Sequence, residues 1–304
     1  MTENNIIFVT YVESVAALHD VYHLAESLRT FGGRFRNCPL RVYIPENVVI
    51  DDSVMVGKLQ DVKAELYSSQ TPDFARWFFY GGKPFAAAWA EAAISNKNTV
   101  LVFMDADTYV LTEPNALDLP ADISLAYCPV MHNRSGTPYN APPNPFWSRI
   151  YEILKVHEEM LFPMVTPADK VRIKAYFHCG LMAVRPHQGI FRRWAKDFET
   201  LCRDSILLNM CKEDINNRIF LHQAALTGAI LNLIDRREML TLSDNYNYPI
   251  FFDKQYGAIR EFNSLEDVVT LRCVVSPEKA GSNWYEKLAG PPDKISWLKE
   301  RLFK

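Results

Sequence analysis

The pattern of apolar and polar positions is most informative where a continuous apolar run ends in two carboxylates. Five of the six residues from Thr99 to Met104 are apolar, which is typical of a strand buried on both faces. Asp105 and Asp107 follow at once. Because side chains two apart on a strand point the same way, at Cα separations of roughly 6–7 Å, both carboxylates can reach one target. Carboxylates this close repel unless a cation or proton lies between them, so the pattern predicts a cation site. The alternative, a loop or helix cap with solvated aspartates, fits the apolar run less well.

Hydrophobic periodicity predicts that strands and helices alternate along the first third of the chain. We expect strands at residues 6–10, 40–44 and 62–67, a helix that begins after Ser14 as its cap and ends at Gly32, and an alanine-rich helix over 84–94. This alternation implies a Rossmann-like, mostly parallel α/β sheet flanked by helices. In such sheets ligands bind beyond the carboxyl ends of the strands. Asp105 and Asp107 lie at that edge of the predicted sheet.

The second half of the chain is predicted to be richer in helices. Residues 138–145 contain four prolines and two asparagines, which indicates a loop, expected over the site. Helices are expected at 146–160, 191–202 and 217–231, and a short strand at 181–184. The large aromatic residues Trp147, Phe191 and Trp194 are expected to pack in the core rather than to bind a sugar.

Composition excludes several classes of protein. With 304 residues, 48% hydrophobic and 23% charged, the chain can bury one large globular core. Its formal net charge of -3 disfavours a nucleic-acid binder. The sequence contains neither a visible secretory signal nor an apolar run of membrane-spanning length. Its six cysteines are scattered without a C-x-x-C pair, so we expect reduced, mostly buried thiols in a cytoplasmic protein.

A set of segments resembles one family of enzymes. The segment from Val102 to Thr108 resembles the D-x-D segment of nucleotide-sugar glycosyltransferases of GT-A fold, glycogenin and its bacterial relatives in particular. Further segments resemble family segments in the same order: Phe8–Tyr11 the first strand, Lys83-Pro84 a lysine region before the D-x-D strand, Tyr176–Met182 the F-N-[SA]-G strand, Leu221–Leu226 the D-Q-x-x-L helix, and Asn245–Pro249 the Y-N segment. Together they span roughly residues 5 to 285, which a single short motif could not do.

The resemblance implies a fold and an activity. It implies one GT-A domain over residues 1–304, with a nucleotide-binding part at about 1–110 and an acceptor-binding part with C-terminal closure at about 111–304. The implied reaction moves a hexose from a nucleoside-diphosphate sugar, with a UDP-sugar favoured, to an unidentified acceptor. Retention of the anomeric configuration is implied by analogy with the family.

The resemblance also implies roles for individual residues. Asp105 and Asp107 would hold Mn²⁺ or Mg²⁺ against the diphosphate, the ion acting as Lewis acid and clamp. The implied contacts to the nucleotide sugar come from Thr10, Tyr11, Lys83, Asp105, Ala106, Asp107, His178, Gly180 and Lys279, and the implied catalytic residues are His222, Gln223 and Asp244. Plain structural roles compete for several of them: strand packing for Tyr11, a structural hydrogen bond for His178 and a turn for Asp244.

The sequence departs from the family pattern in three places. His178 replaces the asparagine of F-N-[SA]-G, His222 replaces the aspartate of D-Q, and the late histidine of a V-V-H-[FY] segment is missing from residues 268–273. The metal site would then lack its usual third ligand. We expect Arg272 and Lys279, near the vacated position, to share the charge of the leaving diphosphate. Because the two carboxylates repel, their removal one at a time is expected to leave stability unchanged or slightly raised.

Two other functions compete with a glycosyltransferase. The missing histidine is compatible with a catalytically silent nucleotide-sugar-binding protein. A haloacid-dehalogenase-like phosphohydrolase also begins with an apolar strand and D-x-D, but it expects Thr or Val where this chain has Tyr109. A calcium-binding loop is disfavoured because Tyr109 and Val110 occupy positions that need an oxygen ligand and a glycine.

Overall fold

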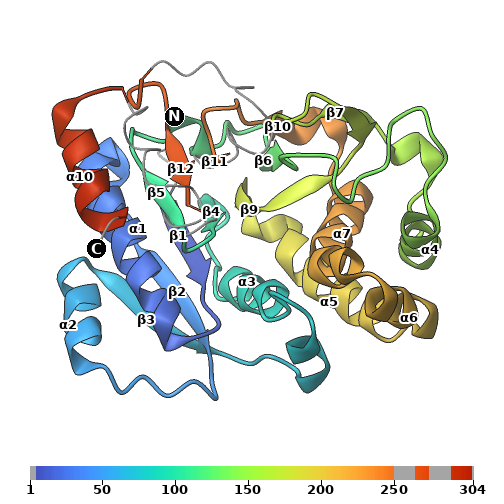
Figure 1. The fold of residues 1–304 in the computed structure, drawn as a ribbon, viewed down its shortest axis with the longest axis horizontal. Coiled ribbons are helices and arrows are strands. Elements are labelled where there is room, and N and C mark those ends of the chain that lie inside the picture. The colour runs from blue at the N-terminus through green and yellow to red at the C-terminus, as the bar shows by residue number, and fades with distance from the viewer. Residues whose placement is uncertain (1–4, 250–263, 274–288, 303–304) are drawn as a thin grey trace.

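A seven-stranded mixed sheet forms the centre of the fold in the computed structural model, which describes residues 5–249, 264–273 and 289–302 (Figure 1). In spatial order its strands are β10 (Met239–Thr241), β6 (Leu125–Pro129), β9 (Phe177–Val184), β4 (Thr99–Met104), β1 (Asn5–Tyr11), β2 (Leu40–Pro45) and β3 (Ala64–Ser69). Four of the six pairings are parallel, and only β9 runs antiparallel to its neighbours β4 and β6. The reversal places the first half of β9 beside the carboxyl end of β4.

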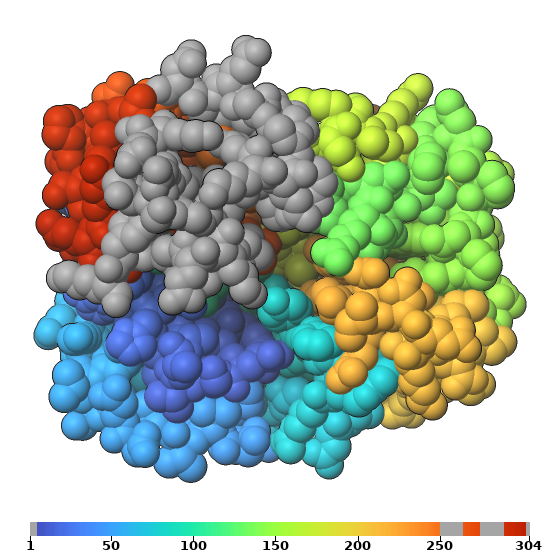
Figure 2. Space-filling view, in the orientation of Figure 1, coloured from blue at the N-terminus to red at the C-terminus, as the bar shows by residue number. Residues whose placement is uncertain are grey.

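Helices cover both faces of this sheet, and alternate strand residues supply each face. Phe8 and Val102 pack under α1 (Leu18–Phe31) and α2 (Ser53–Asp61). Val9 and Phe103 face the opposite way, as the period of two in a strand requires. The helices on that second side are α3 (Lys83–Ala92), α4 (Pro145–Leu154), α5 (Ile190–Cys202), α6 (Ser205–Glu213) and α7 (Ile215–Leu233). In Figure 2 the first hundred residues, in blue and cyan, lie beside the green and orange residues of the second half.

A smaller three-stranded sheet lies next to the carboxyl end of β4. It contains β11 (Tyr248–Pro249), β12 (Thr270–Arg272) and β5 (Thr108–Val110), and it packs with α10 (Pro292–Leu302) around Tyr109, Leu271 and Trp297. β12 runs antiparallel to β5, with Arg272 opposite Thr108. This register places Arg272 beside the double-aspartate segment. A two-stranded sheet of β7 (Pro163–Val165) and β8 (Arg172–Lys174) completes the described strands.

Most of the predicted elements are present, with differences at their ends. Ser14 makes no capping hydrogen bond and precedes a single 3-10 turn. The helix predicted to reach residue 160 ends at Leu154, because Lys155 adopts a left-handed conformation with φ of 56°. The strand predicted at 181–184 begins earlier, at Phe177. Helices α2 and α6 were not predicted, since each covers only nine residues.

Three further expectations concern the core and the surface. All six cysteines are free thiols, four of them buried. Trp147, Phe191 and Trp194 are almost fully buried, which confirms that they pack in the core. Within the described ranges, the helices are all too short or too polar to cross a lipid bilayer.

A buried carboxylate joins two of the helices on one face of the sheet. The Glu91 side chain on α3 is fully buried and accepts hydrogen bonds from the backbone N–H groups of Phe191, at 3.1 Å, and Arg192, at 2.9 Å. These N–H groups belong to the first turn of α5, whose own N-cap residue, Gly189, offers no side-chain acceptor. Glu91 therefore caps α5 from a neighbouring helix.

We predict that Glu91→Ala lowers the free energy of unfolding by about 1–3 kcal/mol, because it leaves buried N–H groups without an acceptor. Urea unfolding at pH 7 measures the change. The exposed Glu213 at the end of α6 supplies the control, and Glu213→Ala should change stability little. Equal losses in the two variants would contradict the capping role of Glu91.

Candidate functional site

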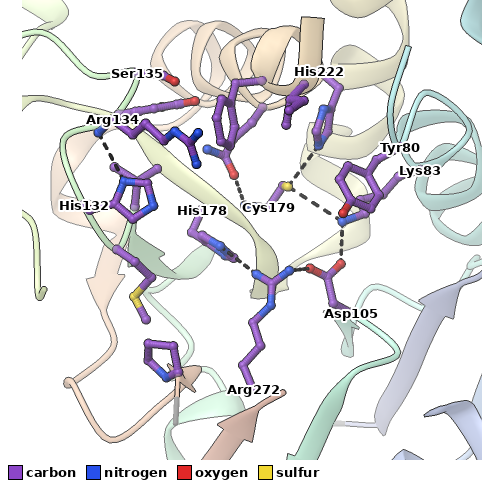
Figure 3. Close-up of a pocket in the computed structure, with 17 residues that line it drawn as sticks. Tyr80, Lys83, Asp105, His132, Arg134, Ser135, His178, Cys179, His222 and Arg272 are labelled. Carbon is purple, nitrogen blue, oxygen red and sulfur yellow. Dashed lines mark hydrogen bonds and ion pairs between the residues drawn. The ribbon is translucent and has the colours of Figure 1, made fainter. Parts of the chain in front are cut away.

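A cavity of about 360 Å³ lies beyond the carboxyl end of β4 (Figure 3). Its lining comes from α3, β9, α7, β12 and the segment that follows β6. Of the residues predicted for the site, Lys83, Asp105, His178, His222 and Gln223 line this cavity, and Arg272 lines it with them. The fold therefore brings together residues from five separate segments of the sequence.

Asp105 lies between two cations at the edge of the cavity. Lys83 Nζ donates to Asp105 Oδ1 at 2.5 Å, and Arg272 Nη2 lies 2.7 Å from Asp105 Oδ2. Lys83 is 5% and Asp105 7% exposed, so the ion pairs are screened little by solvent. Figure 3 shows both cations directed at this carboxylate, Lys83 from α3 and Arg272 from β12.

Arg272 contacts both aspartates and one histidine. Besides its contact with Asp105, its Nε lies 3.5 Å from Asp107 Oδ1, and its Nη1 lies 2.8 Å from His178 Nε2. The Asp107 carbonyl also accepts the N–H of Cys273 at 2.9 Å, which ties the double-aspartate segment to β12. The spacing of the two carboxylates predicted a cation beside them. In this structure the Arg272 guanidinium contacts both carboxylates.

The ion pairs fix the charges of this cluster. Burial by itself would raise the pKa of Asp105, but Lys83 and Arg272 outweigh it and hold that pKa well below its usual range. Burial would likewise lower the pKa of Lys83, and the Asp105 carboxylate raises it instead. The pKa of Asp107 is raised by burial and by Asp105, against the lowering effect of Arg272. Lys83 and Arg272 thus stay cationic beside an ionised Asp105.

His178 is neutral and faces hydrogen-bond donors on both sides. Its Nδ1 accepts the backbone N–H of Gly180 at 2.9 Å, and its Nε2 faces Arg272. Burial and the Arg272 charge lower the pKa of His178 well below its usual value. A neutral imidazole accepts at only one ring nitrogen. The Gly180 N–H and the Arg272 Nη1 therefore compete for the single acceptor nitrogen, and only the tautomer protonated at Nδ1 lets Nε2 accept from Arg272.

Gly180 leaves the space that this cluster needs. A Cβ atom at this position would lie 2.5 Å from His178 Cε1 and 2.6 Å from both Arg272 Nη1 and Asp105 Oδ2. The Gly180 carbonyl also accepts the N–H of Asp105 at 2.8 Å. Any side chain at this position would therefore push the guanidinium away from the carboxylates.

A second group of contacts lies on the α7 side of the cavity. Cys179 Sγ is 3.3 Å from His222 Nε2 and 3.9 Å from Lys83 Nζ. Gln223 Oε1 accepts the Cys179 N–H at 3.2 Å. Burial and the Lys83 charge lower the pKa of His222 to about 3, so its imidazole is neutral. Both residues predicted on α7 thus reach the cavity, His222 as a neutral ring and Gln223 as an amide.

Six of the described residues predicted for the site are not among those that line the cavity: Asp107 and Gly180, which border it through the contacts given above, and Thr10, Tyr11, Ala106 and Asp244. Thr10 is fully buried in β1, and Tyr11 packs in the core, where burial raises the pKa of its phenol to about 12. Its burial favours the strand-packing interpretation of Tyr11 over stacking on a base. Ala106 packs against the core under α1. Asp244 has a side chain 45% exposed and pairs with Lys170 at 3.3 Å. Lys279 lies outside the described residues.

Several cavity residues were not predicted from the sequence. Tyr80 places its ring 4.9 Å from Lys83 Nζ, and Cys179 lies between the predicted His178 and Gly180. His132 and Arg134 also face the cavity (Figure 3). Tyr80, His132 and Arg134 belong to none of the segments that resemble the family. Only Cys179 had a signal, since its neighbours on either side were both predicted for the site.

The described side chains do not fit a resident divalent ion. Both oxygens of Asp105 and one oxygen of Asp107 already face cationic nitrogens. Nowhere in the described ranges are three or more His, Cys, Asp or Glu side chains grouped as a metal site would need. The prediction of Mn²⁺ or Mg²⁺ at Asp105 and Asp107 therefore gains no support from their contacts.

Comparisons with known proteins agree with this architecture. A family model described as the Rhodobacterales glycosyltransferase domain matches residues 9–233. The apo structure of the bifunctional glycosyltransferase WbbM is similar to the whole chain, with a TM-score of 0.53 and 12% identity, and this chain spans about half of it (53%). Galactosyltransferase LgtC, solved with donor and acceptor sugar analogues, has a TM-score of 0.52 at 10% identity over 97% of this chain and 100% of that one. No curated protein matches in sequence. The GT-A fold expected from the sequence is confirmed.

The contacts correct the expectation about stability. Asp105→Ala should lower the free energy of unfolding by about 3–5 kcal/mol, because it leaves Lys83 and Arg272 buried without their shared partner. The depressed pKa of Asp105 means that its stabilising effect is full above about pH 5 and is lost as pH falls through that pKa. Guanidinium chloride unfolding between pH 3 and 7 would follow both effects.

The control for this prediction is an aspartate in a surface ion pair. Asp73 pairs with Arg76 at 3.3 Å, and its side chain is 94% exposed. Asp73→Ala should change stability little, since solvent screens such pairs. An Asp105→Ala variant as stable as wild type at pH 7 would restore the original expectation that the two carboxylates mainly repel.

Proposed function

Given that this chain belongs to the Rhodobacterales glycosyltransferase domain family and is a glycosyltransferase, we propose that it transfers a hexose from a nucleoside-diphosphate sugar to an acceptor hydroxyl at the cavity beside Asp105. One observation carries this location. Two cations, the buried Lys83 and the partly buried Arg272, meet at the carboxyl edge of the sheet and at the wall of the cavity. This is the edge at which α/β sheets bind their ligands.

The reaction needs positive charge beside the leaving diphosphate. The bond between C1 of the sugar and the diphosphate oxygen breaks, and its electron pair leaves on that oxygen. A new bond forms between C1 and the acceptor hydroxyl oxygen, and the hydroxyl proton is released to the leaving diphosphate or to solvent. Lys83 and Arg272 would donate to the phosphate oxygens on which the negative charge grows. These donors are fixed before the reaction begins, so their reorientation adds nothing to the barrier.

The remaining cavity residues would hold the sugar. His222 and Gln223 line the wall opposite Arg272, and each carries polar groups of the kind that bind sugar hydroxyls. His178, being neutral, would orient the guanidinium rather than carry charge. The catalytic role of Asp244 and the nucleotide contacts of Tyr11 and Lys279 stay predictions from the resemblance, as do those of Thr10 and Ala106.

The finer features of the reaction are part of this proposal. Preference for a UDP-sugar and retention of configuration rest on the family resemblance. LgtC was solved with donor and acceptor sugar analogues, which supports a donor and an acceptor here by analogy only. A divalent ion would add Lewis-acid polarisation of the diphosphate if it bound. The cytoplasmic location also stays a prediction.

A donor panel tests the proposed function. The protein is incubated with UDP-, GDP-, ADP-, CDP- and TDP-hexoses, with and without Mn²⁺, and release of the nucleoside diphosphate is followed by chromatography. We expect turnover of one donor class, raised by simple sugar or alcohol acceptors. Binding without turnover would indicate a silent nucleotide-sugar-binding protein, and release of inorganic phosphate a phosphohydrolase.

We predict that Gly180→Ala lowers kcat/KM for the donor by at least about tenfold, because the new methyl group displaces Arg272 from Asp105, and one lost charge-assisted contact costs this much. Donor kinetics and circular dichroism of the same preparation measure activity and folding. The matched control is Gly57→Ala on α2, where a Cβ atom meets no described atom within 4 Å. Unchanged kinetics in Gly180→Ala would show that the position of the guanidinium does not matter for transfer.

A further inference from the structure

We propose that Lys83 and Arg272 together do the work usually done by a divalent ion, so that this protein binds and activates the diphosphate of its donor without metal. The inference rests on the proposed function and assigns the stabilisation of the leaving diphosphate to two side chains instead of a metal ion. Asp105 and Asp107 then act as positioning residues that hold the two cations, rather than as ligands of Mn²⁺ or Mg²⁺. Three observations support this exchange of roles.

The first observation is that three of the four carboxylate oxygens already lie against cationic nitrogens. Asp105 Oδ1 receives Lys83 and Asp105 Oδ2 receives Arg272, at 2.5 and 2.7 Å, while Asp107 Oδ1 faces Arg272 Nε at 3.5 Å. A divalent ion between the aspartates would have to displace the guanidinium. Yet Arg272 is held from behind by β12 pairing and fits a space that Gly180 keeps open.

The second observation is the charge of the cluster. Lys83 and Arg272 each lie against the double-aspartate segment, Lys83 at Asp105 and Arg272 at both aspartates. A divalent cation could reach these carboxylate oxygens only by displacing Lys83 or Arg272 from them, and a guanidinium cannot lose its proton to make room. A diphosphate could instead accept hydrogen bonds from the same two cations. The two side chains therefore take the place that a metal ion would need.

The third observation is that both cations keep unused donors at the cavity. The guanidinium carries five N–H groups, more than its contacts with Asp105, Asp107 and His178 use. Lys83 uses one donor on Asp105, and its remaining neighbours are Cys179 Sγ at 3.9 Å and the face of Tyr80. These donors can bind phosphate oxygens without breaking the ion pairs, and a guanidinium matches phosphate geometry with two parallel bonds.

The first experiment uses the wild-type protein. Binding of the nucleoside diphosphate of the accepted donor is measured by calorimetry in EDTA and in excess Mn²⁺, and donor turnover is measured in the same buffers. We expect affinities and rates within about threefold of each other, less than the tenfold that one charge-assisted contact would cost. Electron paramagnetic resonance with Mn²⁺ alone should detect no ion bound to the protein.

The second experiment removes the charge of Arg272 in one variant and keeps it in another. Arg272→Gln should weaken nucleoside diphosphate binding in EDTA by about 10- to 100-fold, as expected for lost charge-assisted hydrogen bonds. Added Mn²⁺ should recover part of this loss, because the freed Asp105 and Asp107 can then bind an ion. Arg272→Lys should retain more affinity in EDTA than Arg272→Gln. The exposed Arg237, paired with Asp235, supplies a control, and Arg237→Gln should bind as wild type does.

The outcomes separate this inference from the proposed function. Nucleotide binding or turnover that requires Mn²⁺ in wild type would overturn the inference and leave the glycosyltransferase proposal intact. Absence of binding and turnover with every nucleotide of the panel, with or without Mn²⁺, would overturn both. If Arg272→Gln fails to fold, the wild-type comparison in EDTA still decides. A loss in Arg272→Gln that Mn²⁺ does not change would indicate a structural role and contradict the exchange of roles.

Discussion

The contact on which the site depends is the placement of Asp105 between Lys83 and Arg272. A buried carboxylate between a buried lysine and a partly buried arginine is stable only when all three are held in good geometry, because each charge alone would carry a desolvation penalty. The burial of Lys83 and Asp105 shows that this requirement is met by protein groups rather than by solvent. The cations are thereby fixed at a cavity wall, and the site has the positive charge that a diphosphate needs before any ligand arrives.

The fold meets this requirement by bringing two antiparallel strand pairings and the start of one helix to the same point. The antiparallel β9 places Gly180 and His178 beside Asp105, and the pairing of β12 with β5 places Arg272 over the same carboxylate. The first residue of α3, Lys83, approaches from the opposite side. Because α3 and β9 pack in the main core, and β12 packs with β5 and α10 in a smaller cluster, the site cannot be rearranged without disturbing that packing. A rigid frame of this kind suits catalysis by fixed charges.

A guanidinium and a metal ion are different solutions to the same electrostatic problem. A metal ion brings two charges and open coordination positions, but it must be captured from solution. Arginine and lysine bring one charge each, remain attached to the chain, and add directed hydrogen bonds. The sequence carries the aspartates of the first solution and lacks the late histidine that normally accompanies them. In the structure, that histidine's segment contributes Arg272, so the departure from the family pattern coincides with the residue that fills the site.

The sequence alone determined the elements that depend on neighbouring residues. The strand before Asp105 and the helix predicted at 84–94, observed as α3, are both present in the structure, because strand and helix periodicity depends on neighbouring residues. It also indicated Arg272, through the absence of a histidine. Only the tertiary structure decided what the carboxylates contact, that Tyr11 packs in the core, and that Asp244 pairs with Lys170 instead of lining the cavity. Those facts depend on side chains from distant segments meeting in a low-dielectric interior, and no local pattern records which distant partner a charge will find.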